Sequence, residues 1–437
     1  MMATGVQLGT LLSGAGLAFA SKMIVAAGGL IFNAYLGRTF GVEGAGIFFS
    51  ALTFSAIATV VFRLGLDNPV LRLTSEALAF GQVGQAAAIH RKSVAVVAAA
   101  SAAGAVLILS GVGLGAILQA GNSSVLVVLA FMALGIPAQS MAVINAEVLR
   151  AHGRIVVPQF LYQGGVFLVL LPVVMFSSGV GIGDVAVYYA VATWVLFLFS
   201  WLLCRSIVPR DSVSLKRTSW NRLSAAARHM FVVSIMDVVS MWGALAILSF
   251  TAALEEVGAF GVASRAVLVV SSVLVALNVV AAPRFARLYA AEDIAKLARF
   301  SRLVTLTMVT LSAPILIGMV MFAEQVMRLF GAEFSSYAPI LVILSIAHAV
   351  NVVTGPVGYL LMMCGHENQQ RLASMAGAGV LLGLGILMVP LFGALGAAIA
   401  TAAGIVTQNL VALLFVRKSL GFWTVGLSPR LGSVSGG

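Results

Sequence analysis

Ionisable side chains occur within long apolar segments of this sequence, where a charge is costly. Four of them are Lys22, Arg63, Asp237 and Arg265. A charged residue at the centre of a membrane-spanning helix costs at least about 2.5–3.5 kcal/mol, so such residues are rare and mark ion pairs, ligand sites or proton pathways. We therefore take these four as the first candidates for functional residues, provided that the segments around them cross a membrane.

Of the four, Lys22 is the hardest to accommodate in a membrane. It stands in the run FASKMIVAAGG, residues 19–29. About 13 residues separate it from either end of its apolar segment, which is roughly 20 Å in a helix. Because a lysine stem cannot reach across that distance to the membrane surface, Lys22 must face a wet cavity or a partner. One interpretation is a permanent ion pair with Asp237; the other is a cation that meets an anionic substrate.

The composition indicates that these segments do cross a membrane. Of the 437 residues, 61% are hydrophobic and 9% are charged, and the mean hydropathy is +1.09. Soluble domains carry about 25% charged residues, and a soluble globule of this size would need a more polar exterior. The chain is therefore predicted to be an all-α polytopic membrane protein.

Breaks in the apolar pattern divide the chain into twelve segments of the length that a membrane-spanning helix requires, about 20 apolar residues. They lie near 10–35, 46–66, 93–118, 124–148, 156–177, 184–205, 229–250, 258–279, 303–323, 337–363, 372–391 and 394–416.

Lys and Arg residues outside these segments are distributed unevenly. One set of connections, with the C-terminal tail, holds 20 of them, and the other set holds only Arg38 and Arg328. Because short cytoplasmic loops are enriched in Lys and Arg, both termini are predicted to be cytoplasmic. The net charge of +11 then reflects topology and not a nucleic-acid partner. Cys204 and Cys364 fall at cytoplasmic helix ends, where thiols stay reduced.

An internal repeat divides the chain into two halves. Landmarks recur at a nearly constant offset: Gly46 with Gly258, Phe48 with Phe260, Pro69 with Pro283, Arg91 with Arg302, and Gly153 with Gly365. We infer two parallel six-helix bundles, 1–205 and 229–418, joined by a basic cytoplasmic linker, 206–228, and followed by a cytoplasmic tail, 419–437. Transporters with parallel repeats bind substrate between the halves near the midplane, so a central cavity is expected.

A proline follows the second helix of each half. Pro69 and Pro283 come after the glycine-led segments 46–66 and 258–279. Because proline disrupts a helix interior, each segment is predicted to end at its proline. An amphipathic stretch, VLRLTSEALAFGQVGQAAAIHRK (70–92) in the first half, should then lie along the inner membrane surface.

Several stretches resemble the multidrug/oligosaccharidyl-lipid/polysaccharide (MOP) exporter superfamily, and within it the Wzx-type flippases of lipid-linked oligosaccharides. They are YLGRTFGVEGAGIFFSALTFSAIA (35–58), RLGLDNPVLRLTSE (63–76), LRAHGR (149–154), EEVGAFGVASRAV (255–267) and LLMMCGHENQQRL (360–372). The resemblance covers essentially the whole chain. It implies a transporter that carries oligosaccharides linked to polyprenyl (undecaprenyl) diphosphate from the inner to the outer leaflet of the bacterial cytoplasmic (inner) membrane, for surface or exopolysaccharide biosynthesis.

The resemblance also implies where the site lies. In the superfamily, helices 1, 2, 7 and 8 line the central cavity, and Lys22, Arg63, Asp237 and Arg265 fall on those four helices, one on each. We expect Lys22, Arg63, Arg265 and Arg38 to bind the diphosphate, because Arg and Lys are the usual phosphate ligands. Asp237 with Lys22 is expected to act in coupling or gating.

Each of these positions also has a simpler interpretation. Arg63 precedes Asp67 by four residues and fits an ordinary helical ion pair. Arg265 can extend to the periplasmic surface, and Arg38 can be merely interfacial. Glu147 and Arg150 fit a pair at a helix end. Other polar residues of the apolar segments are expected to form interhelical hydrogen bonds; they are Asn33, Gln139, Asn145, Gln163, Asn278, His348, Asn351 and Gln408.

The sequence predicts no cofactor, no metal site and no catalytic residue. It has no G-x-x-x-x-G-K-[ST] motif, so transport is not expected to use ATP directly. The expected partners are the lipid-linked oligosaccharide, membrane lipids, and a polysaccharide polymerase with its chain-length machinery, with the transporter itself a monomer. The alternatives are an H⁺- or Na⁺-coupled drug or metabolite antiporter of the MATE type and, more remotely, a membrane-embedded polysaccharide polymerase or ligase.

Overall fold

A computed structural model describes residues 2–118, 122–154, 156–177, 179–209 and 217–425. Within these ranges the chain packs as two compact units, Met1–Val238 and Val239–Gly437. The division falls inside a helix and not in the expected linker 206–228. Residues 217–228 of that linker are helical, and 210–216 lie outside the described residues.

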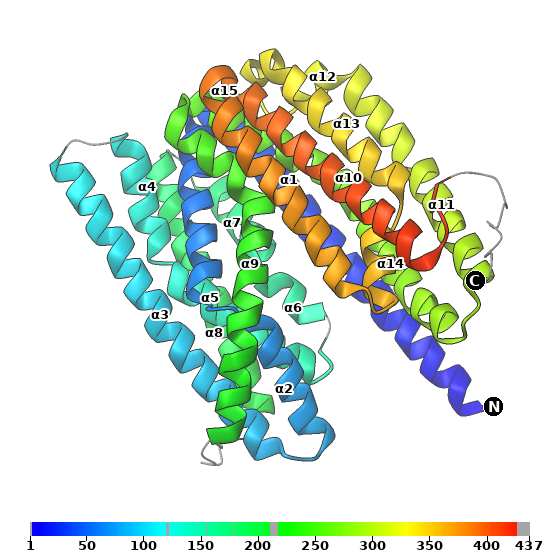
Figure 1. Cartoon of the computed structure of the whole chain (residues 1–437). Helices are drawn as coiled ribbons and strands as arrows, with labels where there is room; N and C mark the ends of the chain where they lie inside the picture. Colours follow the sequence, from blue (N-terminus) through cyan, green and yellow to red (C-terminus); the bar gives the residue numbers. More distant parts are fainter. Residues whose placement is uncertain (1, 119–121, 155, 178, 210–216, 426–437) are drawn as a thin grey trace. The chain divides into compact units, whose positions relative to one another are not determined.

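The first unit is built from helices α1 to α8 and the start of α9 (Figure 1). Their bounds are α1 Met2–Phe62, α2 Asp67–Ala79, α3 Val83–Ile117, α4 Ser123–Ala133, α5 Ile136–Ala151, α6 Val156–Leu161, α7 Gln163–Phe176, α8 Ile182–Ile207 and α9 Arg217–Thr251. Gly41, with φ 68° and ψ −171°, divides α1 into two helical arms. The helices α4 and α5 are bent by 43° and together are long enough to span a membrane.

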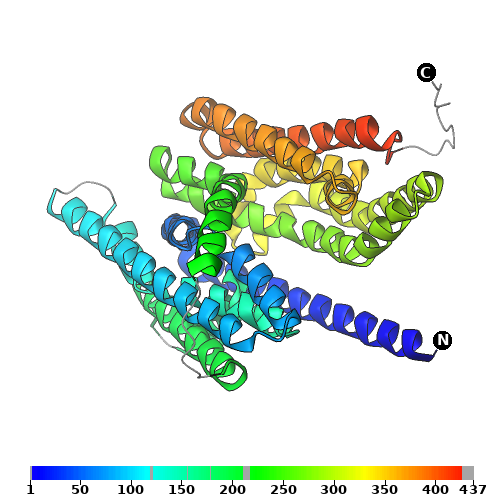
Figure 2. The same cartoon turned by 60° about the horizontal axis from the view of Figure 1, so that its bottom comes forward.

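The second unit contains the rest of α9 and the helices α10 to α15. Their bounds are α10 Leu254–Ala290, α11 Ile294–Met321, α12 Ala323–Arg328, η1 Ala332–Tyr337, α13 Ala338–Thr354, α14 Val357–Met363 and α15 Glu367–Leu420. Gly393, with φ 54° and ψ −130°, divides α15 into two arms, which lie side by side in Figures 1 and 2. A side chain at Gly377 or Gly404 would meet backbone of the other arm at 2.7 and 2.9 Å, so small residues let the arms pack closely.

The described helices are consistent with the twelve predicted spans. Eight are long and apolar enough to cross a membrane, and two of these, α1 and α15, are each divided in two by their glycine. The bent pair α4–α5 passes the same test when its helices are taken together, and the apolar helix in α7, Gly164–Phe176, is shorter. The protein is therefore a multi-pass, all-α membrane protein.

The repeat is visible in the helix bounds. The second arm of α1 begins after Gly41, at Val42, and α10 begins at Leu254, which is the offset that separates Gly46 from Gly258. The same offset relates the end of α5, at Ala151, to the end of α14, at Met363. Equivalent helices of the two units can therefore be compared residue by residue at this offset.

The prediction that each second helix ends at its proline is wrong. In the first unit the helix ends at Phe62, before a turn in which Leu64 and Gly65 have positive φ. Pro69 instead lies in the first turn of α2, where its missing N–H has no helical partner to lose. In the second unit α10 continues through Pro283 to Ala290.

The amphipathic helix after this turn is confirmed. In α2 the residues Pro69, Val70, Leu73, Thr74 and Ala77 are buried, which is the spacing of one helical face. That face packs against α3 and α5. The helix is shorter than the predicted stretch 70–92, because the chain turns at Gly81 and continues as α3.

Gly65 allows the turn and a close helix contact at once. Its φ is +68°, and a Cβ there would lie 2.5 Å from the Ala227 carbonyl oxygen and 2.5 Å from the Phe231 nitrogen of α9. Gly81 has nearly the same φ, +69°, but a Cβ there would meet nothing within 4 Å.

We predict that Gly65→Ala lowers the melting temperature of the detergent-solubilised protein substantially more than Gly81→Ala does. Both variants bear the cost of a left-handed alanine, about 1–2 kcal/mol, but only Gly65→Ala also forces α9 to move. Thermal unfolding of the two purified variants checks this. Equal losses would show that the contact between this turn and α9 contributes nothing to stability.

Candidate functional site

The polar residues of the first unit converge on α5, which is buried along nearly its whole length. Its polar side chains reach four neighbouring elements. Gln139 Nε2 donates to the Leu161 carbonyl oxygen at 3.1 Å, and Ser140 Oγ donates to the Thr59 carbonyl oxygen at 3.5 Å. Buried polar groups need such partners inside a membrane, where water cannot replace them.

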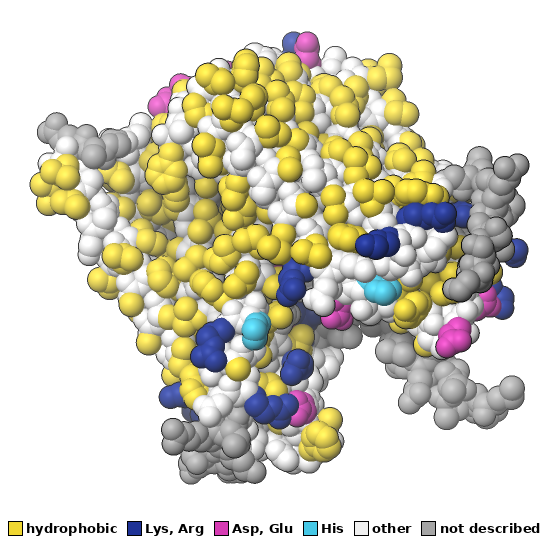
Figure 3. Space-filling model, in the orientation of Figure 1, with side chains coloured by type: hydrophobic (Ala, Val, Ile, Leu, Met, Phe, Trp, Pro, Cys, Tyr) yellow, Lys and Arg dark blue, Asp and Glu magenta, His cyan; other side chains and the backbone are white. Residues whose placement is uncertain are grey.

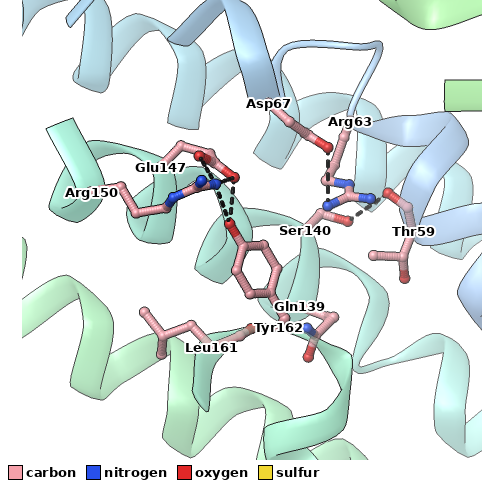
Figure 4. A network of polar contacts seen from close by, with 9 residues as sticks. All are labelled: Thr59, Arg63, Asp67, Gln139, Ser140, Glu147, Arg150, Leu161 and Tyr162. Atoms are coloured by element: carbon pink, nitrogen blue, oxygen red, sulfur yellow. Dashed lines mark hydrogen bonds and ion pairs between the residues drawn. The ribbon is translucent and has the colours of Figure 1, made fainter. Parts of the chain in front are cut away.

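Glu147 is the buried carboxylate of this helix, with 4% of its side chain exposed. The hydroxyl of Tyr162, which lies between α6 and α7, donates to Glu147 Oε1 at 2.5 Å, and Arg150 Nη1 donates to Glu147 Oε2 at 3.0 Å. Arg150 Nη1 also donates to the Tyr162 oxygen at 3.0 Å, which closes the triangle (Figure 4). Burial first, and then the nearby carboxylate, raises the pKa of Tyr162, so its hydroxyl stays protonated as the donor.

Asn145, two residues before Glu147, extends the polar contacts to two further helices. Its Oδ1 lies 2.8 Å from His90 Nε2 of α3, and its Nδ2 donates to Ser200 Oγ of α8 at 2.9 Å. The Cys204 thiol contacts the Asn145 carbonyl oxygen at 3.7 Å. Together these contacts fix α3, α5 and α8, and they assign a structural role to this part of the helix.

Arg63 forms the ordinary pair that its spacing predicts. Its Nη1 lies 3.2 Å from Asp67 Oδ2, with 12% of the arginine side chain and 21% of the aspartate side chain exposed. Burial raises the pKa of Asp67, and the neighbouring Arg63 opposes that shift. Arg63 and Asp67 lie beside the Glu147 triangle (Figure 4), so this candidate cation already has an acidic partner.

Lys22 and Asp237 differ from Arg63 in their surroundings. Both side chains are exposed, and among the described residues no ion pair joins either of them to another group. The described structure therefore does not show the Lys22–Asp237 pair that the sequence left open.

Arg265 is held by an aromatic ring. Its guanidinium carbon lies 4.8 Å from the centre of the Trp242 ring, which comes from α9 and is buried. A desolvated cation–π contact contributes about 2 kcal/mol and leaves the positive charge in place. Arg38, the fourth expected cation, is exposed and lies shortly before the break at Gly41. No contact between Arg38, Arg63 and Lys22 is observed in the described part of the first unit.

Sequence reasoning missed Tyr162 and Trp242. Tyr162 comes from the connection between α6 and α7, and Trp242 comes from the helix that precedes the one carrying Arg265, so neither contact follows from helical spacing. The predicted pair of Glu147 with Arg150 is confirmed. A buried carboxylate with a single cation beside it has room for a further hydrogen-bond donor, and this is the signal that could have led to Tyr162.

Many Lys and Arg side chains of the first unit gather at one end of the face drawn in Figure 3. On the face in Figure 3, hydrophobic side chains cover the middle, and Lys and Arg side chains gather at the end where α2 and the start of α9 lie. Arg222 of α9 pairs there with Glu76 of α2 at 3.0 Å.

We predict that Tyr162→Phe destabilises the protein by roughly 1.5–3 kcal/mol, the value of a hydrogen bond to a charged group. Combined with Glu147→Gln, the substitution should cost less than the sum of the two single losses, because both remove the same bond. Thermal or denaturant unfolding of the four proteins gives the comparison. The matched control is Tyr188→Phe, since the Tyr188 hydroxyl bonds to none of the described residues; strictly additive losses would refute the triangle.

Comparison with solved structures shows a common fold at low sequence identity. An inward-facing multidrug resistance MATE family transporter of the MOP superfamily aligns with a TM-score of 0.71 at 14% identity, covering 93% of this chain and 98% of that one. The lipid II flippase MurJ, in an inward closed conformation, aligns with a TM-score of 0.73 at 13% identity, covering 92% and 87%.

A third similar structure is a MOP superfamily transporter from Pyrococcus furiosus, described as having a binding pocket of reverse polarity that suggests a different function. It aligns with a TM-score of 0.59 at 14% identity and covers 93% of this chain and 94% of that one. No curated protein matches the sequence significantly.

The family profile described as "Polysaccharide biosynthesis protein" matches residues 11–289, more than half of the chain. With the fold of MOP superfamily transporters and a family match that reaches into the second repeat, the chain belongs to the polysaccharide biosynthesis protein family.

Proposed function

We propose that this protein flips oligosaccharides linked to polyprenyl diphosphate from the inner to the outer leaflet of the bacterial cytoplasmic membrane, with both termini in the cytoplasm. The family match supports a role in polysaccharide biosynthesis, and the fold is one used by a lipid flippase and by multidrug transporters. Such a protein moves its substrate without breaking a covalent bond, so no catalytic step is assigned to any residue.

The proposal rests mainly on Lys22, because this lysine has no acidic partner among the described residues. It lies inside a span, and within the described residues no acid pairs with it. A cation at that depth requires water or an anionic ligand. A lipid diphosphate supplies that anion, and the lysine ammonium can donate charge-assisted hydrogen bonds to it.

Arg265 supports the same substrate chemistry in the second unit. Trp242 stabilises its position in the span but does not neutralise it, whereas an acidic partner would. Arg63 contributes less, because Asp67 already binds it. We therefore assign the diphosphate to Lys22, and Arg265 is a separate candidate anion contact of the second unit. We expect Arg63 to serve the packing of the first unit, with Arg38 outside the primary contacts.

An ion-coupled antiporter is the second candidate. Asp237 favours it, because an acid inside a span that pairs with none of the described cations can carry a proton or bind Na⁺. If Asp237 couples flipping to a proton gradient, Asp237→Asn will change the transport rate and its pH dependence while the protein stays folded. A flippase without proton coupling at this residue would keep the wild-type pH profile.

We predict that Lys22→Gln slows flipping at least about tenfold, the loss expected when one charge-assisted contact to phosphate is removed. Lys22→Arg should retain most of the activity, since arginine also binds phosphate. The assay follows polyprenyl-diphosphate-linked oligosaccharide in reconstituted vesicles by its accessibility to an added lectin.

Lys296→Gln is the matched control, because Lys296 is 73% exposed and pairs with Asp293 at the start of α11. If Lys22→Gln flips the lipid at the wild-type rate, or if Lys296→Gln slows flipping by as much, the proposal is wrong.

A further inference from the structure

The second unit contains a polar cavity of about 290 Å³ between α10, α13, α14 and α15. Among the described residues that line it there is no Asp, Glu, Lys or Arg. Their polar side chains include Ser271, Asn278, His348, Asn351, Tyr359 and Gln408. A water molecule takes about 30 Å³ of liquid, so the cavity has room for about ten waters or for one small ring.

Among the described residues, two of these amides lack the interhelical hydrogen bonds that the sequence predicted for them. Asn278 is buried, with 7% of its surface exposed, and its Oδ1 has no partner in the described structure. The Asn351 side chain likewise bonds to none of the described residues. His348 and Gln408 do make contacts, to Ser271 at 3.4 Å and Ser374 at 3.3 Å. A buried unpartnered amide costs about 1–3 kcal/mol, which suggests that a ligand or water completes it.

The repeat allows the residues that line this cavity to be compared with their equivalents in the first unit. At the repeat offset, Ser271, Val275, Asn351, Tyr359 and Met362 correspond to Thr59, Arg63, Gln139, Glu147 and Arg150. In the first unit those positions belong to the polar contacts of Figure 4, and three of them, Arg63, Glu147 and Arg150, form ion pairs. In the second unit the ion pairs are replaced by neutral groups around an open space. The two halves thus use the same positions for different chemistry.

The junction between α13 and α14, at Gly355, lies beside the cavity. Gly355 has φ +77°, and a Cβ there would collide with the Thr305 side chain of α11. The chain therefore breaks between α13 and α14 beside the cavity, which places Asn351 before the break and Tyr359 after it.

We infer that this cavity binds an uncharged, hydroxyl-rich ring, namely one sugar residue of the transported lipid-linked oligosaccharide. Each Asn and Gln offers both an acceptor and donors, and each sugar hydroxyl is both a donor and an acceptor. An anionic group would find no cation among the lining residues, and a cation would find no carboxylate. A site built to hydrogen-bond hydroxyl groups discriminates strongly against ligands that lack them. The inference rests on the proposed function, and it assigns sugar recognition to the second unit.

The test compares two lipids binding to the full-length protein by native mass spectrometry. One is the polyprenyl-diphosphate-linked oligosaccharide extracted from the source organism, and the other is polyprenyl diphosphate without sugar. The wild-type protein should bind the sugar-bearing lipid at least tenfold more tightly. Asn278→Leu and Asn351→Leu should abolish that difference and leave the affinity for the bare lipid unchanged.

Stability distinguishes a binding role from a structural one. Asn278→Leu removes a buried unpartnered oxygen, so its melting temperature should equal or exceed that of the wild type. Thr310→Val, on the exposed face of α11, is the control and should keep the sugar-dependent difference.

Three results would overturn the inference. The wild type could bind the two lipids with equal affinity, both asparagine variants could keep the full preference for the sugar-bearing lipid, or Asn278→Leu could lower the melting temperature. Failure of the proposed function gives a separate result, in which the wild-type protein binds neither lipid.

Discussion

Two donors, the Arg150 guanidinium and the Tyr162 hydroxyl, hold the buried Glu147 carboxylate, and much of the first unit is arranged around this contact. A membrane interior offers no water to an unmatched charge, so α5 can keep Glu147 only if neighbouring elements supply the donors. Asn145 on the same helix ties α3 and α8 to it in the same way. These contacts join α5 to α3, to α8 and to the connection between α6 and α7.

The cost of an unmatched charge in a membrane also separates the charged residues in and beside the spans into two classes. Arg63 and Glu147 have partners of opposite charge, so their contacts account for their presence. Lys22 and Arg265 have no acidic partner among the described residues, and Arg265 has only the Trp242 ring. A charge that the fold does not neutralise is available to a ligand, which is why we assign the diphosphate to Lys22 and regard Arg265 as a separate candidate contact in the second unit.

Sequence reasoning predicted the spans and the repeat because both depend on patterns that recur along the chain. It predicted the pair of Arg63 with Asp67 and that of Glu147 with Arg150, since helical spacing brings such residues together. It failed at Pro69 and Pro283, where the turn is made by Leu64 and Gly65 or is not made at all. The partners Tyr162 and Trp242 were missed because contacts between helices leave no local signal.

Among the described residues, each unit has a feature that suits a lipid-linked oligosaccharide: the first has the unpaired Lys22 for a diphosphate, and the second has an uncharged cavity for a sugar. The central claim is that Lys22 serves the diphosphate, and the most direct measurement is the affinity of the purified protein for polyprenyl diphosphate relative to the uncharged polyprenol. We predict that the wild type binds the diphosphate at least about 100-fold more tightly, about 2.7 kcal/mol, and that Lys22→Gln loses most of that preference. Equal affinities of the wild type for the two lipids would contradict the account.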